Sequence, residues 1–144
     1  MRDRRRGAKS KNYRRSVNVQ VVARAREQRI VDVGEAWPGN RNDVVVYRAT
    51  VAATCRGHPP ARVLADGAYR GEASVTSPRR GPGGRIVCDR AYERFRRRRA
   101  RAEHVIGELK AFTVLREIRH RDARIDHTIR AVAARHNLKL DVAA

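Results

Sequence analysis

Cysteine, aromatic residues and long apolar runs are all scarce in this sequence of 144 residues. Its two cysteines, Cys55 and Cys88, do not form the repeated Cys and His spacing of a zinc site, and we expect both thiols to be free. Aromatic residues make up 5% of the chain, too few to anchor it in a membrane surface. No apolar run approaches the roughly 20 residues of a membrane-spanning helix, and the basic residues after Met1 lack the apolar core of a secretion signal. We therefore expect a cytoplasmic protein.

Acidic residues are also few. The chain has 34 Lys and Arg against 15 Asp and Glu, a formal net charge of +19. So large an excess of one sign repels itself unless a polyanion neutralises it, which indicates a nucleic acid as the partner. The length suits one small domain. We expect a basic flexible arm at residues 1–15, one folded domain at residues 16–144, and a flexible basic loop within it at residues 77–85, which are rich in Pro, Gly and Arg.

Three short segments have the pattern of β-strands. Apolar and polar residues alternate over residues 17–21, and an apolar run follows at residues 30–33, so the two predict an antiparallel hairpin. The turn-forming residues 37–40 are expected to end the second strand. Residues 63–65 form another apolar run directly before Asp66, which predicts a buried strand that delivers Asp66 to its C-terminal edge.

Helical spacing dominates the second half of the sequence. Apolar residues recur at helical intervals from about residue 89 to residue 116 and predict one long amphipathic helix that packs on the sheet. The same pattern over about residues 122–141 predicts a final helix. A shorter helix is predicted over residues 43–54, with Asn42 or Asp43 as its N-cap. Strands and helices together predict an α/β fold.

Two acidic residues lie where they could carry chemistry. On the predicted long helix, Arg96 and Arg99 precede Glu103 by seven and four positions, and Lys110 follows it by seven, so all four share one face. The spacing leaves two interpretations open: Glu103 binds a ligand within a basic strip, or it offsets its arginines on a solvated face. Asp66, followed by glycine, could likewise be a ligand or an ordinary turn residue.

Longer segments of the sequence resemble a known family. Residues 63–71 read Val-Leu-Ala-Asp-Gly-Ala-Tyr-Arg-Gly and resemble the strand-Asp-x-x-Tyr-x-Gly block of DDE transposases related to insertion-sequence and Harbinger elements. That block holds the family's second catalytic aspartate, which Asp66 matches. Residues 99–112 resemble the family's helix in which a Glu is followed by Gly-x-Leu-Lys and then an aromatic residue, and Glu103 matches the third catalytic acid.

Two flanking blocks extend the resemblance. Residues 16–22 resemble the family's hairpin and residues 130–138 its terminal helix, so that nearly the whole chain from about Lys9 is covered, in the family's order. The resemblance implies part of a DDE catalytic domain with a truncated RNase H-like fold. We expect a small mixed sheet, made of the hairpin and a buried strand, packed with the long helix and the C-terminal helix.

The family resemblance also implies a reaction: metal-dependent cleavage of DNA and transfer of the cut strand. Divalent metals lower the charge on the scissile phosphate and activate the attacking water or 3′-hydroxyl. Because Mg²⁺ prefers oxygen ligands, Asp66 and Glu103 are the expected ligands of Mg²⁺ or Mn²⁺, and His104 and His136 are expected in packing or DNA contacts. The partner is then the DNA of the element ends and target, in the bacterial nucleoid, held by Arg96, Arg97, Arg99, Arg101 and Lys110.

The sequence departs from the family at the first catalytic aspartate. In the family this residue lies on a strand upstream of the basic segment with which the present sequence begins, and Asp3 has no strand context to replace it. We expect the isolated chain to be inactive and marginally stable, and to need a second copy or an upstream transposase segment. Asp43 matches an Asp that follows a Pro-Gly turn in the family; we interpret it as a helix cap, with an active-site neighbour as the alternative.

A non-catalytic basic module that binds DNA or RNA is the competing hypothesis. It predicts an affinity that falls steeply with salt and requires no metal. In that case Asp66 and Glu103 are ordinary turn and surface residues. A structural protein assembled on ribosomal RNA is a third alternative, for which a preference for RNA would be the evidence.

Overall fold

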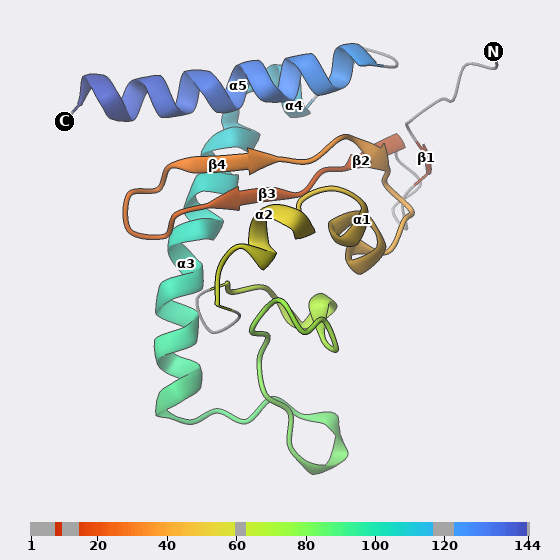
Figure 1. Ribbon diagram of the computed structural model, residues 1–144, viewed down its shortest axis with the longest axis vertical. Helices are drawn as coiled ribbons and strands as arrows, with labels where there is room; N and C mark the ends of the chain where they lie inside the picture. The colour runs from red at the N-terminus through yellow and green to blue at the C-terminus, as the bar shows by residue number, and fades with distance from the viewer. Residues whose placement is uncertain (1–7, 10–14, 60–62, 117–122, 144) are drawn as a thin grey trace.

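The computed structural model describes residues 8–9, 15–59, 63–116 and 123–143. Most of the predicted arm, including Asp3, lies outside these residues. Within the described part the chain forms short strands followed by helices (Figure 1). The strands are β1 Ala8–Lys9, β2 Arg15–Asn18, β3 Val21–Ala23, β4 Ile30–Val33 and β5 Trp37–Pro38. The helices are α1 Asp43–Ala49, α2 Ala52–Arg56, α3 Arg90–Ala111, α4 Thr113–Arg116 and α5 Ala123–Val142.

The strands form two small antiparallel sheets rather than the predicted mixed sheet. β3 and β4 form an antiparallel hairpin as predicted, with Val21 opposite Val33 and an irregularity between Val22 and Ala23, but its first strand begins at Val21 instead of at residue 17. Val17 and Asn18, predicted for that strand, belong to β2, which lies between β1 and β5. The prediction of a turn at Trp37 and Pro38 was wrong, because these two residues pair with β2 as β5 and the chain turns only after them. Proline is tolerated there because β5 is an edge strand.

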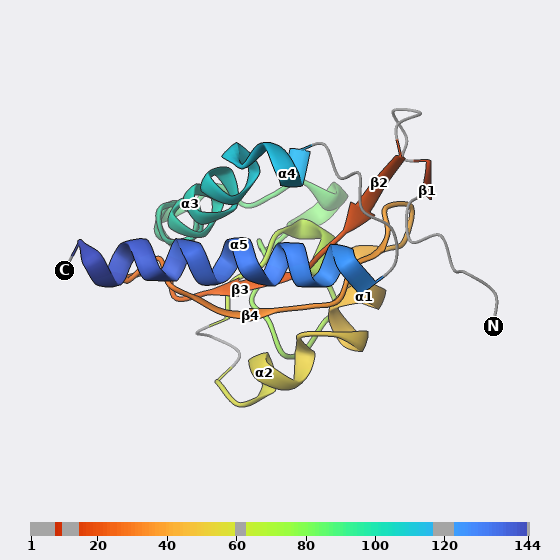
Figure 2. The ribbon, with the colours of Figure 1, turned by 90° about the horizontal axis from the view of Figure 1, so that it is seen from above.

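Helices cover the β3–β4 hairpin on both faces. Figure 1 shows α1 and α2 in front of the hairpin, α3 behind it and α5 along its upper edge, and Figure 2 shows α3 and α2 on opposite sides of the strands. The alternation of side chains along β3 explains this arrangement. Val21 and Ala23 pack toward α3 and α5, whereas Val22 packs toward α1 and α2.

The predicted long helix and final helix are confirmed and form the larger part of the core. Val105 and Leu109 of α3 are buried against Ile30 of β4 and against Val132 and Ala133 of α5. Asp89 caps α3, because its carboxylate accepts a hydrogen bond from the backbone N–H of Tyr92 at 2.8 Å. The helix ends one turn earlier than predicted, where the extended backbone of Phe112 separates it from α4.

Two predictions about shorter elements were wrong. Residues 63–65 do not form a strand within a sheet, because among the described pairings Leu64 makes only one isolated parallel bridge, with Thr76. The segment is half-buried, and Val63 and Ala65 pack against the cluster around Tyr47 and Val75. The predicted helix at residues 43–54 is divided into α1 and α2. Its cap is Asn42, whose side chain accepts from the N–H of Val44 at 2.9 Å, so Asp43 is not the cap.

Three further features concern the cysteines, the basic loop and the helices of the described residues. Cys55 and Cys88 are free thiols, the first buried and the second exposed. The loop at residues 77–85 contains the short 3-10 helix Pro82–Gly84 and a bridge between Arg80 and Ile86. No helix of the described residues combines the length and apolar character needed to cross a membrane.

Candidate nuclease site

Asp66 lies in a tight turn directly after the Leu64 bridge. Its carboxylate caps the 3-10 helix Gly67–Tyr69 by accepting a hydrogen bond from the backbone N–H of Ala68 at 2.8 Å. This bond uses one carboxylate oxygen, Oδ1, and fixes the orientation of the half-buried side chain. The turn therefore holds Asp66 in place whether or not it also binds a ligand.

A row of hydrogen bonds leads from the same turn to α1. The hydroxyl of Tyr69 donates to Oε1 of Gln20, and Nε2 of Gln20 donates to Oδ1 of Asn18 at 2.9 Å. Nδ2 of Asn18 then donates to Oδ1 of Asp43 at 2.6 Å. The row joins residues that are as many as 49 positions apart in the sequence. Asp43 and the turn of Asp66 are thus linked through Asn18, the last residue of β2, and Gln20, which lies between β2 and β3.

Tyr69 lies close to both carboxylates. The pKa of its phenol is raised to about 12, mainly because the ring is buried and further because the negative charges of Asp43 and Asp66 oppose ionisation. Tyr69 is therefore neutral at physiological pH and acts as a hydrogen-bond donor. The ring also joins the two elements that carry these acids, because it packs against Tyr47 of α1, which Asp43 begins, and belongs to the turn that Asp66 caps.

A second row of polar contacts lies beside the first. The rings of Tyr47 and Tyr69 meet edge to face, with centroids 5.6 Å apart. The hydroxyl of Tyr47 lies 2.8 Å from that of Ser74, which donates to Glu72 at 2.9 Å. Burial raises the pKa of Tyr47 to about 12 as well. The hydrogen bond from Arg48 to Glu72 is the main reason that the pKa of this carboxyl is lowered.

Glu103 lies on α3 and pairs with a different partner. Its side chain is 56% exposed and forms an ion pair with Arg99, one turn earlier on the helix. Among the described residues, no group of three or more His, Cys, Asp or Glu side chains is arranged to hold a metal ion. Asp43, Asp66 and Glu103 therefore do not converge as such a group here, and a metal shared by Asp66 and Glu103 stays a prediction.

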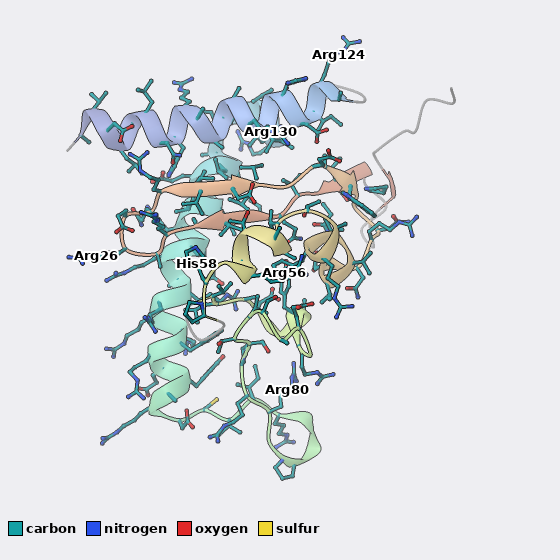
Figure 3. All side chains as sticks on the ribbon, in the orientation of Figure 1. Arg26, Arg56, His58, Arg80, Arg124 and Arg130 are labelled. Carbon is teal, nitrogen blue, oxygen red and sulfur yellow. The ribbon has the colours of Figure 1, made fainter. Side chains whose placement is uncertain are left out.

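The arginines of α3 line the approach to the segment that carries Asp66. A cavity of about 470 Å³ lies between the first half of the helix and the Leu64–Thr76 bridge. Its walls include Phe95 of α3, and Arg94, Arg97 and Arg98 lie around it. Figure 3 shows several side chains with nitrogen ends extending from this half of α3 into solvent. Arg96 instead lies over the ring of Tyr92, at 6.0 Å from its centroid, and Arg101 and Lys110 are exposed.

His104 and His136 both contact Glu108. Nδ1 of His136, a buried residue of α5, lies 3.0 Å from the carboxylate, and its Nε2 lies 2.8 Å from the carbonyl oxygen of Gln28. Nε2 of His104 lies 3.1 Å from the other carboxylate oxygen. The predicted packing role of His136 is therefore confirmed: it joins α3, α5 and the hairpin loop.

Sequence reasoning missed Asn18, Gln20 and the role of Tyr69. One signal for the first two was present: they stand two positions apart in an otherwise apolar stretch, which places them on the same face of an extended segment. A buried glutamine needs hydrogen-bond partners, and Gln20 is only 9% exposed. The identity of those partners depends on the tertiary fold.

Comparison with known proteins gives consistent results. The chain matches the family model described as DDE superfamily endonuclease over residues 6–137. It is 36% identical over 135 residues to a protein of Streptomyces albus G assigned as the transposase for insertion sequence element IS112. That alignment covers 92% of this chain and 52% of the relative, so the chain spans about half the length of the curated relative it matches. No solved structure matches the chain.

Proposed function

This chain belongs to the DDE endonuclease superfamily, and on that premise we propose that it forms part of an insertion-sequence transposase that cleaves DNA and transfers the cut strand. Members of the superfamily generally use divalent metal ions. The observation that supports the proposal most strongly is the position of Asp66, the match to a catalytic acid, as the cap of the turn whose Tyr69 is linked by hydrogen bonds to Asp43. Carboxylates supply the oxygen atoms that Mg²⁺ and Mn²⁺ prefer as ligands.

The residues present fit Mg²⁺ or Mn²⁺ in the chemistry of their donors. Asp66 and Glu103 are the proposed ligands, with Asp43 as an active-site neighbour, and all three supply the oxygen atoms that these ions prefer. Bound there, the metal lowers the charge on the scissile phosphate and activates the attacking hydroxyl or water. The contribution of the chain is to hold the carboxylates: the 3-10 turn orients Asp66, and the Asn18 amide orients Asp43. To bind the metal, the carboxylate of Glu103 has to break its ion pair with Arg99, or Arg99 has to stay paired with it at the site.

A further acid belongs to the complete site. The curated relative is about twice as long as the matched segment, so a transposase of that length has room for the first acid outside it. We propose that an upstream segment or a second copy supplies this carboxylate. The isolated chain should then be inactive, because a metal with an incomplete ligand set loses the positioning on which phosphoryl transfer depends.

The basic face of α3 is the proposed DNA contact. Arg97 lies at the cavity beside the Leu64 bridge, and exposed Arg101 and Lys110 continue along the helix. Arg96 and Arg99 have contacts of their own, with Tyr92 and Glu103, and reach phosphate only by exchanging them. Each phosphate neutralised releases counterions, so binding should weaken steeply as salt is raised.

Metal titration tests the proposal. Mn²⁺ is titrated by calorimetry into the chain with short duplex DNA, for the wild type, Asp66→Ala and Glu103→Ala. Loss of binding in both variants supports a shared site. The matched control is Glu35→Ala, which removes an exposed carboxylate of the β4–β5 connection and should leave Mn²⁺ binding unchanged.

A non-catalytic DNA-binding module is the second candidate. The ion pair between Glu103 and Arg99 and the lack of a three-ligand cluster among the described residues favour it. It predicts that DNA binds with the same affinity when divalent metal is removed by a chelator. DNA binding that depends on divalent metal and requires both Asp66 and Glu103 would exclude the non-catalytic module.

A further inference from the structure

Within the described part of the chain, the carboxylate of Asp43 is held by the neutral side chain of Asn18. Nδ2 of Asn18 donates to Oδ1 of Asp43 and also lies 3.2 Å from the carbonyl oxygen of Arg41. The amide orients the carboxylate without neutralising it. Asp43 begins α1, and α1 packs through Tyr47 against Tyr69 of the 3-10 turn that Asp66 caps. Such an arrangement suits a carboxylate that acts on a cation.

All hydrogen bonds in the row that ends on Asp43 are donated in the same direction, toward Asp43. The hydroxyl of Tyr69 donates to Gln20, Gln20 donates to Asn18, and Asn18 donates to the carboxylate. A carboxylate can only accept, so Asn18 must present its amide nitrogen to Asp43 and its oxygen to Gln20. Gln20 must in turn present its oxygen to Tyr69. The carboxylate at one end thus sets the orientation of both amides.

The middle of the row is fixed by its backbone as well. Gln20 is buried at the junction of β2 and β3, and its carbonyl oxygen accepts a hydrogen bond from Gly34 at 2.9 Å. No buried side-chain nitrogen or oxygen of the described residues lacks a partner. A buried polar network in which every member is satisfied rigidifies its surroundings and specifies one arrangement.

We propose that Tyr69, Gln20 and Asn18 are positioning residues that fix the carboxylate of Asp43 relative to that of Asp66. This inference rests on the proposed function, because it assigns the pair to the metal site of the nuclease. Asp43 then faces the metal, and the row acts on the metal through it. Outer contacts of this kind typically change metal affinity about 10-fold to 100-fold when they are removed.

Tyr47 supplies a matched control within the same aromatic pair. Its ring packs against that of Tyr69, its phenol has a similarly raised pKa, and its hydroxyl is also hydrogen-bonded. Tyr47→Phe and Tyr69→Phe each delete one oxygen atom from one buried cluster. The two variants differ in the destination of the deleted hydrogen bond: Ser74 for Tyr47, and the row to Asp43 for Tyr69.

The experiment compares Mn²⁺ affinity by calorimetry at neutral pH, with duplex DNA present, in the wild type and both phenylalanine variants. We expect Tyr69→Phe to weaken Mn²⁺ binding about 10-fold, the lower end for such contacts, and Tyr47→Phe to change it less than about 2-fold. In an Asp43→Asn background, Tyr69→Phe should have no further effect, because the row no longer ends on a carboxylate. Equal losses in the two variants, or a full Tyr69→Phe effect without Asp43, would overturn the inference.

A second measurement does not depend on metal. The side-chain amide signals of Asn18 are followed by NMR in the metal-free protein. Tyr69→Phe should shift them through Gln20, whereas Tyr47→Phe should not; unchanged Asn18 signals in Tyr69→Phe would show that no such row exists. If the wild type binds no Mn²⁺, the proposed function fails, and the amide signals still decide whether Tyr69 controls the orientation of Asn18.

Discussion

Replacing Asn137 with alanine tests how α5 is held against the β3–β4 hairpin. The side chain of Asn137 makes two hydrogen bonds with the backbone of Ile30 in β4. Its Oδ1 accepts from the N–H of Ile30 at 2.9 Å, and its Nδ2 donates to the carbonyl oxygen of Ile30 at 2.8 Å. Asn137 thus pairs with β4 as the backbone of a neighbouring strand would. Ile30 is only 6% exposed. The substitution therefore removes two hydrogen bonds at once and leaves two backbone groups without their partner.

The loss of stability depends on what replaces the two hydrogen bonds in Asn137→Ala. Removing each hydrogen bond costs about 1 kcal/mol, and a buried unpaired group costs roughly 1–3 kcal/mol. A groove of about 420 Å³, lined by Ile30, Val33, Arg130 and Asn137 among others, opens beside these groups. Water that enters it can satisfy them in part, so we expect the lower end, about 2 kcal/mol in total. That is a large share of the roughly 5–15 kcal/mol that stabilises a domain.

Urea unfolding followed by circular dichroism measures the effect. Asn137→Ala should lower the midpoint with little change in the slope of free energy against urea. Leu138→Ala is the control, since the neighbouring side chain is 62% exposed and its loss should change stability by no more than about 0.5 kcal/mol. Equal midpoints for the two variants would refute the idea that Asn137 closes the edge of β4.

Three further predictions follow from the structure. Gly39→Ala should lower the melting temperature in calorimetry, because a Cβ there would lie 2.6 Å from the carbonyl oxygen of Ser16, where backbone atoms cannot give way. The pKa of Glu72 is lowered in the folded protein, so its carboxylate stabilises the fold at pH above the unfolded-state pKa near 4.5, and this stabilisation is lost as the pH falls through the folded-state pKa. Glu72→Gln should therefore make the free energy of unfolding depend less on pH in the acid range. Arg97→Ala with Arg101→Ala should reduce the salt slope of DNA binding by about 0.9 for each phosphate that the protein no longer neutralises; an unchanged slope would remove α3 from the interface.

The elements that the sequence predicts well are those defined by neighbouring residues. The helical spacing of Val105 and Leu109, together with the cap at Asp89, is sufficient to predict α3. The hairpin of β3 and β4 is also local in sequence. In contrast, the local residue types at Trp37 and Pro38 predict a turn. Their strand partner, β2, lies about twenty residues earlier, and no local pattern indicates that pairing. The apolar run at residues 63–65 predicts a strand, but only tertiary neighbours decide whether a sheet surrounds it.

The candidate site divides in the same way. Asp66 and Glu103 could be named from the sequence because the segments around them resemble family blocks, whereas composition and spacing left both open. Asn42, rather than Asp43, caps α1, and either residue was compatible with the local pattern. The link from Tyr69 to Gln20 spans 49 positions, and no periodicity contains it. Long-range polar contacts of this kind require the fold itself.

Iron-mediated cleavage of the protein tests the central claim, a divalent metal held at Asp66, most directly. Fe²⁺ replaces Mg²⁺ in the chain bound to duplex DNA, ascorbate and peroxide generate radicals at the metal, and mass spectrometry locates the backbone cuts. We expect cuts near residues 66–69 and near Asp43, which excess Mg²⁺ suppresses and Asp66→Ala abolishes. Cuts that lie elsewhere, or that persist in Asp66→Ala, would contradict the claim.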